Sequence, residues 1–352
     1  MPLRRFSCQD FRCLVAAEFE PHPHFTLVSG ANASGKTSLL EAIGFLGRGR
    51  SFRGAGVRDV VRHGAAECLV TGIVETGGRD HRLGVRHGRG GLALSVDGDH
   101  SGGLAALASA LPLQVIDPDV HRLVGGAPDE RRRFLDWMGF HVEQGFLESW
   151  RRFRRALKQR NALLREGQGG LDSWDEEFAR AGEALHEARA RIVATALPTL
   201  ESVAGRLLGV SVGFEYMAGW PRDQRLAAAL AGHRERDRQA GTSQYGPHRA
   251  DLRLRVDERV ARKLVSRGQQ KLLACALVLA SIEVAAGALG RPPLLLLDDP
   301  AAELDAAALG RLMDAVGALG TQVVATALAP EAVPVPAEHA KFHVEQGALR
   351  PA

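Results

Sequence analysis

The sequence lacks the features that would place it in a membrane or direct it to secretion. It contains no uninterrupted apolar run of about 18 residues or more, which is the length that a membrane-spanning helix requires. Its charged N-terminal segment is not followed by the apolar stretch of a signal peptide. We therefore expect a cytoplasmic protein that has no membrane span.

Cysteine is scarce, and its spacing excludes the common uses of that residue. The four cysteines, Cys8, Cys13, Cys68 and Cys275, are scattered without the close spacing of metal ligands, which favours reduced thiols in a cytoplasmic protein. The sequence also shows no internal repeat and no heptad run long enough for a coiled coil.

What remains is the composition of a globular protein with a slight basic excess. Hydrophobic residues make up 45% and charged residues 24% of the 352-residue chain, which is ordinary for a folded domain. The formal net charge of +4 permits an anionic partner but does not identify one. The length exceeds that of a typical single domain, so we expect one large core and a smaller lobe.

Patterning along the chain predicts an α/β protein with a helical insertion. The N-terminal third contains strands and turns, including a short apolar strand at 25–29, a helix from Thr37, and antiparallel strands between Cys68 and Leu104. From Pro128 to about Leu208 the pattern is helical and charged. The sequence therefore predicts a head formed by residues 1–112 and 206–352, interrupted by a helical arm at 113–205.

The first long helix of this predicted arm has an apolar stripe and a basic face. The stripe consists of Phe146, Trp150, Phe153, Leu157 and Leu164, whereas Arg151, Arg154, Arg155 and Lys158 lie largely off it. A second charged run, Arg234 to Arg238, lies near glycines, and we expect it to form a solvated loop.

Residues 30–37 (GANASGKT) fit the phosphate-loop pattern G-x-x-x-x-G-K-[ST] between a predicted strand and a predicted helix. A glycine-rich turn lets backbone N–H groups point at a polyphosphate, and the start of the following helix adds partial positive charge. Lys36 can reach the β- and γ-phosphates, and the Thr37 hydroxyl can bind Mg²⁺. The candidate nucleotide-binding residues in this segment are Gly30, Asn32, Ser34, Gly35, Lys36, Thr37 and Ser38.

Two acidic residues follow a run of four leucines, as in a Walker B strand. Asp298 would hold Mg²⁺, and Asp299 would orient or deprotonate the attacking water, with Lys36 as the other candidate catalytic residue. A core strand that ends in a solvated acidic turn has the same pattern. The upstream phosphate loop favours the first interpretation.

A helix start that lies 32 residues before Asp298 resembles the ABC signature motif. There Ser266, Gly268 and Gln269 are candidate nucleotide contacts, and Arg267 replaces the first glycine of the motif. An ordinary N-cap serine is the commoner explanation of such a serine by itself, but its position before the acidic strand favours the signature motif. Residues 301–305 (AAELD) resemble the D-loop, and Thr326 stands where ABC proteins have a switch histidine.

With these motifs the chain resembles the RecF family of bacterial recombination and repair proteins over almost its whole length. The resemblance also includes LGRGRSF (46–52), RRRFLDW (131–137), RALKQRNALL (155–164) and GPHRAD (246–251). It implies an ABC-type ATPase head related to SMC proteins, with mixed sheets around a central helix and a short helical arm. It also implies a slow ATPase with ATP and Mg²⁺ as cofactors, and a role in DNA repair, DNA replication and the SOS response.

The resemblance further implies partners. ATP would drive head-to-head dimerisation, and the dimer would bind double-stranded DNA and junctions between single and double strands. Together with RecO and RecR, such a protein directs RecA onto single-stranded gaps. Two departures concern the site: Ala33 occupies a phosphate-loop position where the family usually has glycine, and Pro300 follows the paired aspartates. In the segment that replaces the ABC Q-loop, either Gln114, Asp117 or neither faces the metal.

Basic residues in two regions are candidates for DNA contact. Between Arg131 and Arg165, ten Lys and Arg residues face three acidic residues, an excess that suits salt-sensitive binding to phosphates. A solvated helix face would have the same composition. The candidates are Arg151, Arg154, Arg155 and Lys158 on the arm and Arg48, Arg50 and Arg53 beside the phosphate loop.

Two rival functions remain open at this point. The first is an ABC ATPase subunit of another assembly such as a transporter, which the separation of 230 residues between Lys36 and Ser266 and the basic insertion disfavour. The second is a scaffold in which nucleotide is purely structural, which would not need the second carboxylate, that of Asp299.

Overall fold

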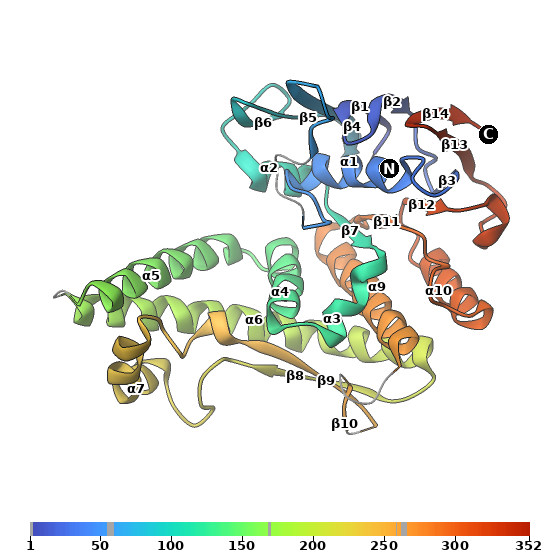
Figure 1. Cartoon of the computed structure of the whole chain (residues 1–352). Coiled ribbons are helices and arrows are strands. Elements are labelled where there is room, and N and C mark those ends of the chain that lie inside the picture. The colour runs from blue at the N-terminus through green and yellow to red at the C-terminus, as the bar shows by residue number, and fades with distance from the viewer. Residues whose placement is uncertain (1–2, 55–59, 168–169, 258, 262–265) are drawn as a thin grey trace. The chain divides into compact units, whose positions relative to one another are not determined.

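The computed structural model describes residues 3–54, 60–167, 170–257, 259–261 and 266–352 (Figure 1). By their internal contacts they form two compact units. The first comprises Met1–Val120 with Gly290–Ala352, and the second comprises His121–Leu289.

The first unit contains a six-stranded sheet in the order β14-β13-β3-β12-β11-β7. Its strands are β3 (Phe25–Ser29), β7 (Leu113–Ile116), β11 (Leu294–Leu297), β12 (Val323–Ala327), β13 (Ala340–Glu345) and β14 (Ala348–Pro351). All neighbours are parallel except β13 and β14. Every residue of β3, β11 and β12 is buried, which explains why these strands are continuous apolar runs rather than alternating ones.

A second sheet of the same unit is antiparallel, in the order β2-β1-β4-β5-β6. It is formed by β1 (Arg5–Phe11), β2 (Leu14–Phe19), β4 (Glu67–Thr76), β5 (Arg79–Gly88) and β6 (Gly91–Val96). The alternation of buried and exposed residues in β4 and β5 shows that one face covers the core. The antiparallel strands predicted between Cys68 and Leu104 are thereby confirmed.

Helix α1 (Lys36–Arg48) contacts both sheets, and ten of its 13 residues are buried. The core around it includes Phe6 and Phe45 as well as Leu296 of β11 and Val324 of β12. This arrangement of mixed sheets around a central helix is the predicted ATPase-head architecture. The unit is completed by α2 (Gly103–Ala110), α10 (Ala306–Ala318) and the short 3-10 helix η4 (Pro330–Ala332).

The second unit is mainly helical. Its helices are α3 (Arg122–Gly125), α4 (Pro128–Val142), α5 (Phe146–Glu166), α6 (Leu171–Leu208), α7 (Leu226–Ala240) and α9 (Arg267–Leu289). A small antiparallel sheet joins β8 (Val212–Met217), β9 (Asp251–Val256) and β10 (Arg259–Val260). The 3-10 turn η2 (Pro118–His121) spans the chain boundary between the two units, and η3 (Pro247–Arg249) precedes β9.

The predicted domain boundary differs from this division. The sequence prediction assigned residues 206–289 to the head, but they lie in the second unit because α7, α9 and β8 all pack against the long helix α6. The strand pattern after Gly241 was identified correctly, but a strand pattern does not tell which core the strand joins. The helical unit is therefore larger than the predicted arm.

Helices α9 and α7 of the second unit both contain residues whose burial differs from what their composition suggests. Helix α9 is long and apolar enough to cross a membrane by length and composition, but most of its apolar window is buried, as in the core helix of a globular unit. The run from Arg234 to Arg238 is not the predicted loop, because it lies within α7. Asp237 in this run is fully buried, and Arg160 of α5 donates a hydrogen bond to it.

Candidate nucleotide site and basic surfaces

The phosphate loop connects β3 to α1, as the sequence predicts. Gly30 and Gly35 have φ angles of +157° and +116°. A Cβ on Gly30 would lie 2.3 Å from the carbonyl oxygen of Val344, so only glycine fits at the start of the loop. Ala33 is also left-handed, with a φ of 62°. The departure from glycine at this position therefore leaves the turn intact, at a conformational cost of about 1 kcal/mol.

The loop presents donors that suit a polyphosphate. Helix α1 begins without a capping side chain and without an acid in its first turn, so its first amides have no acceptor within the helix. The Ser34 hydroxyl is buried and has no hydrogen-bond partner among the described residues. The Lys36 ammonium lies over the loop and donates to the Gly30 and Ala31 carbonyls at 2.6 and 2.8 Å. The orphaned hydroxyl and the cradle closed around Gly30 both fit a bound phosphate.

The other two candidates in the loop differ in exposure. Asn32 is exposed at its tip. Ser38 is buried, and its hydroxyl accepts a hydrogen bond from the Cys13 thiol at 3.4 Å. Ser38 would therefore contribute to phosphate binding through its backbone amide.

The buried carboxylate of Asp298 lies within hydrogen-bond distance of the loop. It follows β11, and its Oδ1 accepts hydrogen bonds from the hydroxyls of Thr37 at 3.0 Å and Thr326 at 2.8 Å. Burial raises the pKa of Asp298, and the two hydroxyl bonds partly oppose that rise. The oxygens of Thr37 and Asp298 are the hard ligands that Mg²⁺ prefers. The predicted metal-binding pair is thus brought together across 261 residues of sequence.

Thr326 has a role that the sequence did not predict. Besides its bond to Asp298, its hydroxyl accepts the Asp299 amide at 3.0 Å. Thr326, which occupies the position of the switch histidine of ABC proteins, therefore holds both acidic residues in place. Asp299 is half-buried and has a left-handed φ of 47°. Further on, Asp305 of the D-loop-like segment caps α10 by accepting the Ala308 amide at 2.7 Å.

The two candidates of the Q-loop segment are separated by the structure. Gln114 lies buried in β7, and its side-chain oxygen accepts a hydrogen bond from Arg48 at 3.2 Å. Asp117 follows the end of β7, beside Asp298 at the end of the neighbouring strand. Burial, followed by repulsion from Asp119 and Asp298, raises the pKa of Asp117 to about 6. Of the two candidates, Asp117 therefore lies beside Asp298, whereas the Gln114 side chain contacts Arg48.

In the second unit the signature-like residues form a capping box. The Ser266 hydroxyl accepts the Gln269 amide at 3.3 Å, and the Gln269 side chain accepts the Ser266 amide at 3.0 Å. The N-cap interpretation is therefore correct, and it is compatible with the functional one. The exposed Ser266 hydroxyl keeps its own hydrogen for an anion. The Gln269 side chain, in contrast, is engaged within the box.

The basic candidates beside the phosphate loop separate into inward and outward residues. Arg48 donates to the Leu113 carbonyl at 3.1 Å and to Gln114, and burial lowers its pKa to about 10. We therefore do not retain Arg48 as a DNA contact. Arg50 is exposed, and Arg53 is half-exposed at 3.9 Å from the Glu41 carboxylate.

Buried ion pairs connect the family-like segments of the second unit, and local sequence patterns do not predict these pairs. Arg131 binds both carboxylate oxygens of Asp251, at 2.6 and 3.1 Å. Arg189 binds Asp136 at 2.8 Å and the Pro247 carbonyl at 2.7 Å. These contacts join α4 to β9 and to α6, and α6 to the 3-10 turn η3. Arg131 is counted in the basic run, but its role is structural.

Comparison with known families places the chain. The family model described as RecF/RecN/SMC N terminal domain matches residues 2–348. A DNA replication and repair protein RecF of Chromohalobacter salexigens is 41% identical over 99% of both chains, and that of Thioalkalivibrio sulfidiphilus has the same identity and coverage. The chain belongs to the RecF family. Its relatives in that family are DNA replication and repair proteins.

Solved structures agree on the fold. The recombination mediator protein RecF with ATP, from the RecFOR pathway, superposes with a TM-score of 0.89 over 100% of this chain and 97% of that one, at 23% identity. An SMC head bound to the C-terminal winged-helix domain of ScpA superposes with a TM-score of 0.60 at 16% identity, over 100% of this chain and 97% of that one. The RecF-family chain therefore has the ATPase-head fold that RecF shares with SMC proteins.

Proposed function

We propose that this RecF-family protein binds DNA under the control of ATP in recombinational repair. The observation that carries the proposal is the hydrogen-bonded set of Thr37, Asp298 and Thr326 beside a phosphate loop whose donors suit a polyphosphate. Family membership supplies the context, because the curated relatives are DNA replication and repair proteins and a RecF structure with ATP is similar in fold.

The residues of the first unit suit ATP hydrolysis. The α1 amides and Lys36 would bind the β- and γ-phosphates, and Thr37 and Asp298 would hold Mg²⁺, which neutralises charge that develops between the phosphates. Asp299 would take a proton from water as the water oxygen bonds to the γ-phosphorus and the bond to ADP breaks. With one such base and no switch histidine, we expect weak hydrolysis that DNA stimulates.

A complete site would need two protomers. Ser266 and the amides that follow it at the start of α9 would receive the γ-phosphate held by the other protomer. ATP would then join two heads, and hydrolysis would release them. The closed dimer would bind double-stranded DNA at junctions with single strands, and with RecO and RecR it would promote RecA loading in the cytoplasm.

The dimer is tested by light scattering with and without ATP and Mg²⁺. We expect the mass to double with ATP in the wild type and to remain that of a monomer in Lys36→Met and Ser266→Arg. Ser202→Arg on the exposed face of α6 is the matched control and should dimerise normally. An unchanged wild-type mass on addition of ATP would refute the composite site.

DNA recognition is tested separately with gapped and blunt duplexes. We expect ATP to strengthen binding to both and to favour the gapped duplex. Equal affinity with and without ATP would instead support a structural role for the nucleotide.

A further inference from the structure

Half of the basic residues between 131 and 165 are engaged in ion pairs. Of the ten basic residues between 131 and 165, five bind carboxylates in the structure, namely Arg131, Arg132, Arg133, Arg152 and Arg160. The other five, Arg151, Arg154, Arg155, Lys158 and Arg165, make no salt bridge within the described part of the chain. All five lie on the exposed side of α5. This set, and not the whole run, is available to an outside partner.

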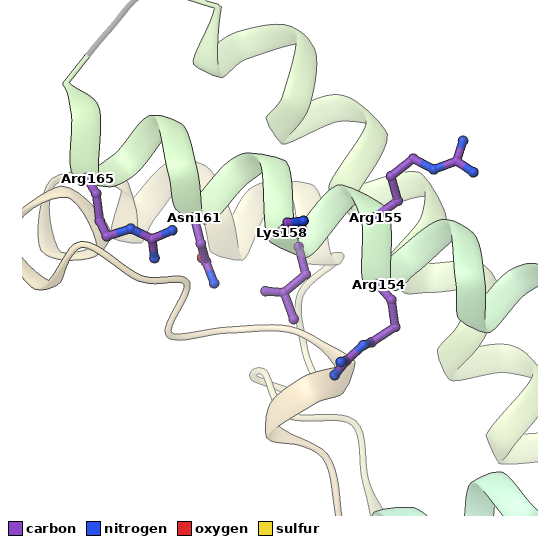
Figure 2. A pocket seen from close by; sticks show the side chains of 6 residues that line it. Arg154, Arg155, Lys158, Asn161 and Arg165 are labelled. Atoms are coloured by element: carbon purple, nitrogen blue, oxygen red, sulfur yellow. The ribbon is translucent and has the colours of Figure 1, made fainter. Parts of the chain in front are cut away.

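Four of these five residues surround a shallow hollow on α5 (Figure 2). It is lined by Arg154, Arg155, Leu157, Lys158, Asn161 and Arg165. Five of the six belong to, or directly follow, the RALKQRNALL segment (155–164), which the proposed nucleotide site does not use. This family-like segment therefore forms most of the lining of the hollow.

Asn161 is held so that its amide nitrogen is left for the hollow. Its side-chain oxygen accepts hydrogen bonds from the Ser243 amide at 2.9 Å and from the Ser243 hydroxyl at 2.7 Å. The backbone donor identifies the accepting atom as oxygen, so the NH₂ group with its two donors remains. Ser243 is itself buried and accepts a hydrogen bond from Arg160. The orientation of Asn161 is therefore fixed from within the unit.

Arg154 is also pre-positioned. Its guanidinium carbon lies 5.3 Å from the centroid of the Trp150 ring, a distance at which the cation and the ring attract each other. Stacking on the ring leaves the N–H groups at the edge of the guanidinium able to donate. A side chain held in this way loses less conformational entropy when it binds a partner.

The lining has one sign of charge and one apolar residue. Each polar group among the six lining residues is a cation or the Asn161 amide, and none is a carboxylate. A surface made of donors attracts acidic groups. Leu157, which is half-buried, lies between Arg154 and Lys158 along the helix and offers apolar contact.

We propose that this hollow docks an acidic segment of a partner protein. Carboxylates of the segment would bind Arg154, Lys158 and the Asn161 amide, and an apolar side chain would cover Leu157. A protein segment fits better than duplex DNA, because it can place an apolar side chain on Leu157 between carboxylates, whereas the sugars of a duplex lie behind its charged phosphate oxygens. The inference goes beyond the proposed ATP-controlled DNA binding and does not depend on it.

The test uses the full chain and a fluorescein-labelled peptide with the repeating sequence Asp-Leu-Glu, followed by anisotropy. A neutral peptide of equal length with the repeat Asn-Leu-Gln measures charge-independent binding. We expect the acidic peptide to bind the wild type and Lys158→Glu to weaken that binding by roughly tenfold. Asn161→Asp should have a similar effect, because it retains the oxygen that binds Ser243 and replaces the two N–H donors with a carboxylate oxygen.

The control variant is Arg206→Glu, which reverses an exposed charge on α6 outside the hollow and should bind the peptide like the wild type. The same variants are assayed with duplex DNA and ATP, where we expect affinities within about twofold of the wild type. Absence of acidic-peptide binding, equal binding of the neutral peptide, or a parallel loss of duplex affinity in Lys158→Glu would overturn the proposal. A wild type that binds the peptide but not DNA would refute only the proposed function.

Discussion

Glu41 is a fully buried carboxylate on the helix that begins at the phosphate loop. Arg12 binds both of its oxygens, at 3.0 and 2.7 Å, and the Ser51 hydroxyl donates to it at 2.5 Å. Arg53 lies 3.9 Å away. The Glu41 side chain therefore joins α1 to the β1–β2 turn, through Arg12, and to the segment after α1, through Ser51 and Arg53. Such a group stabilises the fold only while its charge partners remain.

We predict that Glu41→Gln lowers the free energy of unfolding of the first unit by about 3 kcal/mol, because the partly buried Arg12 charge loses its counter-charge. All four tryptophans and both tyrosines lie in the second unit, so their fluorescence does not report on α1. Hydrogen exchange of α1 peptides in increasing urea is the suitable measurement. Glu18→Gln, which breaks an exposed pair with Arg5, is the control and should change stability by less than about 1 kcal/mol.

His248 gives the second unit a pH dependence. It lies 6.1 Å, between ring centroids, from both Phe153 and Phe178, and its Nε2 lies 2.8 Å from the Ser243 carbonyl. Burial lowers its pKa from 6.5 to about 4. Below pH 6.5 the unfolded chain takes up a proton that the folded chain resists. The stabilising contribution is therefore complete above pH 6.5 and is lost as the pH falls towards 4.

We predict that tryptophan fluorescence will show the urea midpoint of the wild type falling between pH 6.5 and 4. In His248→Gln, which keeps an amide donor for Ser243, the fall should be smaller by the equivalent of about 3 kcal/mol. An identical fall in both proteins would show that other groups cause the acid sensitivity.

Among the elements, α5, α6 and α7 are joined by Arg160, a fully buried guanidinium. It donates to Asp175 of α6 and to Asp237 of α7, both at 2.7 Å. Asp237 has no exposed surface and also accepts the Gln244 amide at 2.9 Å. The packing of α5, which carries the hollow, against α6 and α7 therefore depends on the carboxylates of Asp175 and Asp237 around the Arg160 guanidinium.

We predict that Asp237→Asn destabilises the second unit by about 3 kcal/mol, because it leaves the Arg160 charge with one carboxylate instead of two. Urea unfolding followed by tryptophan fluorescence measures the effect. Glu176→Gln removes an exposed pair with Arg180 in the same unit and should cost less than about 1 kcal/mol. Equal effects of the two variants would contradict a structural role for Arg160.

The success of sequence analysis differed between these elements for a physical reason. The phosphate loop, the acidic strand and the α5 stripe were predictable because strand, turn and helix signals are local. Arg160 was only counted among the ten basic residues of the arm and Asp237 was placed in a solvated loop, because their pairing spans 77 residues and single-sequence patterns carry no such contact. The same limitation explains why residues 206–289 were placed in the head, because local strand and helix signals do not tell which core an element joins.

For the molecule as a whole, the net charge of +4 says little about where DNA would bind. Ion pairs engage many of the basic residues, and exposed cations are found on both units, among them Arg50 and Arg53 on the first and the five α5 cations on the second. If the outward residues of the first unit contact phosphates, their removal should change the salt dependence of binding. Removal of an inward residue should change stability instead.

We predict that duplex affinity measured with ATP falls steeply with rising KCl, and that Arg50→Ala reduces the slope of log affinity against log salt by about 1, since one phosphate contact is lost. Arg48→Ala is the matched comparison. It should leave the slope unchanged and lower the stability of the first unit, because its guanidinium holds the Leu113 carbonyl and Gln114. Titrations at several salt concentrations distinguish the two variants. A slope unchanged in Arg50→Ala would remove Arg50 from the DNA-binding surface, and a reduced slope in Arg48→Ala would show that Arg48 turns outward on DNA.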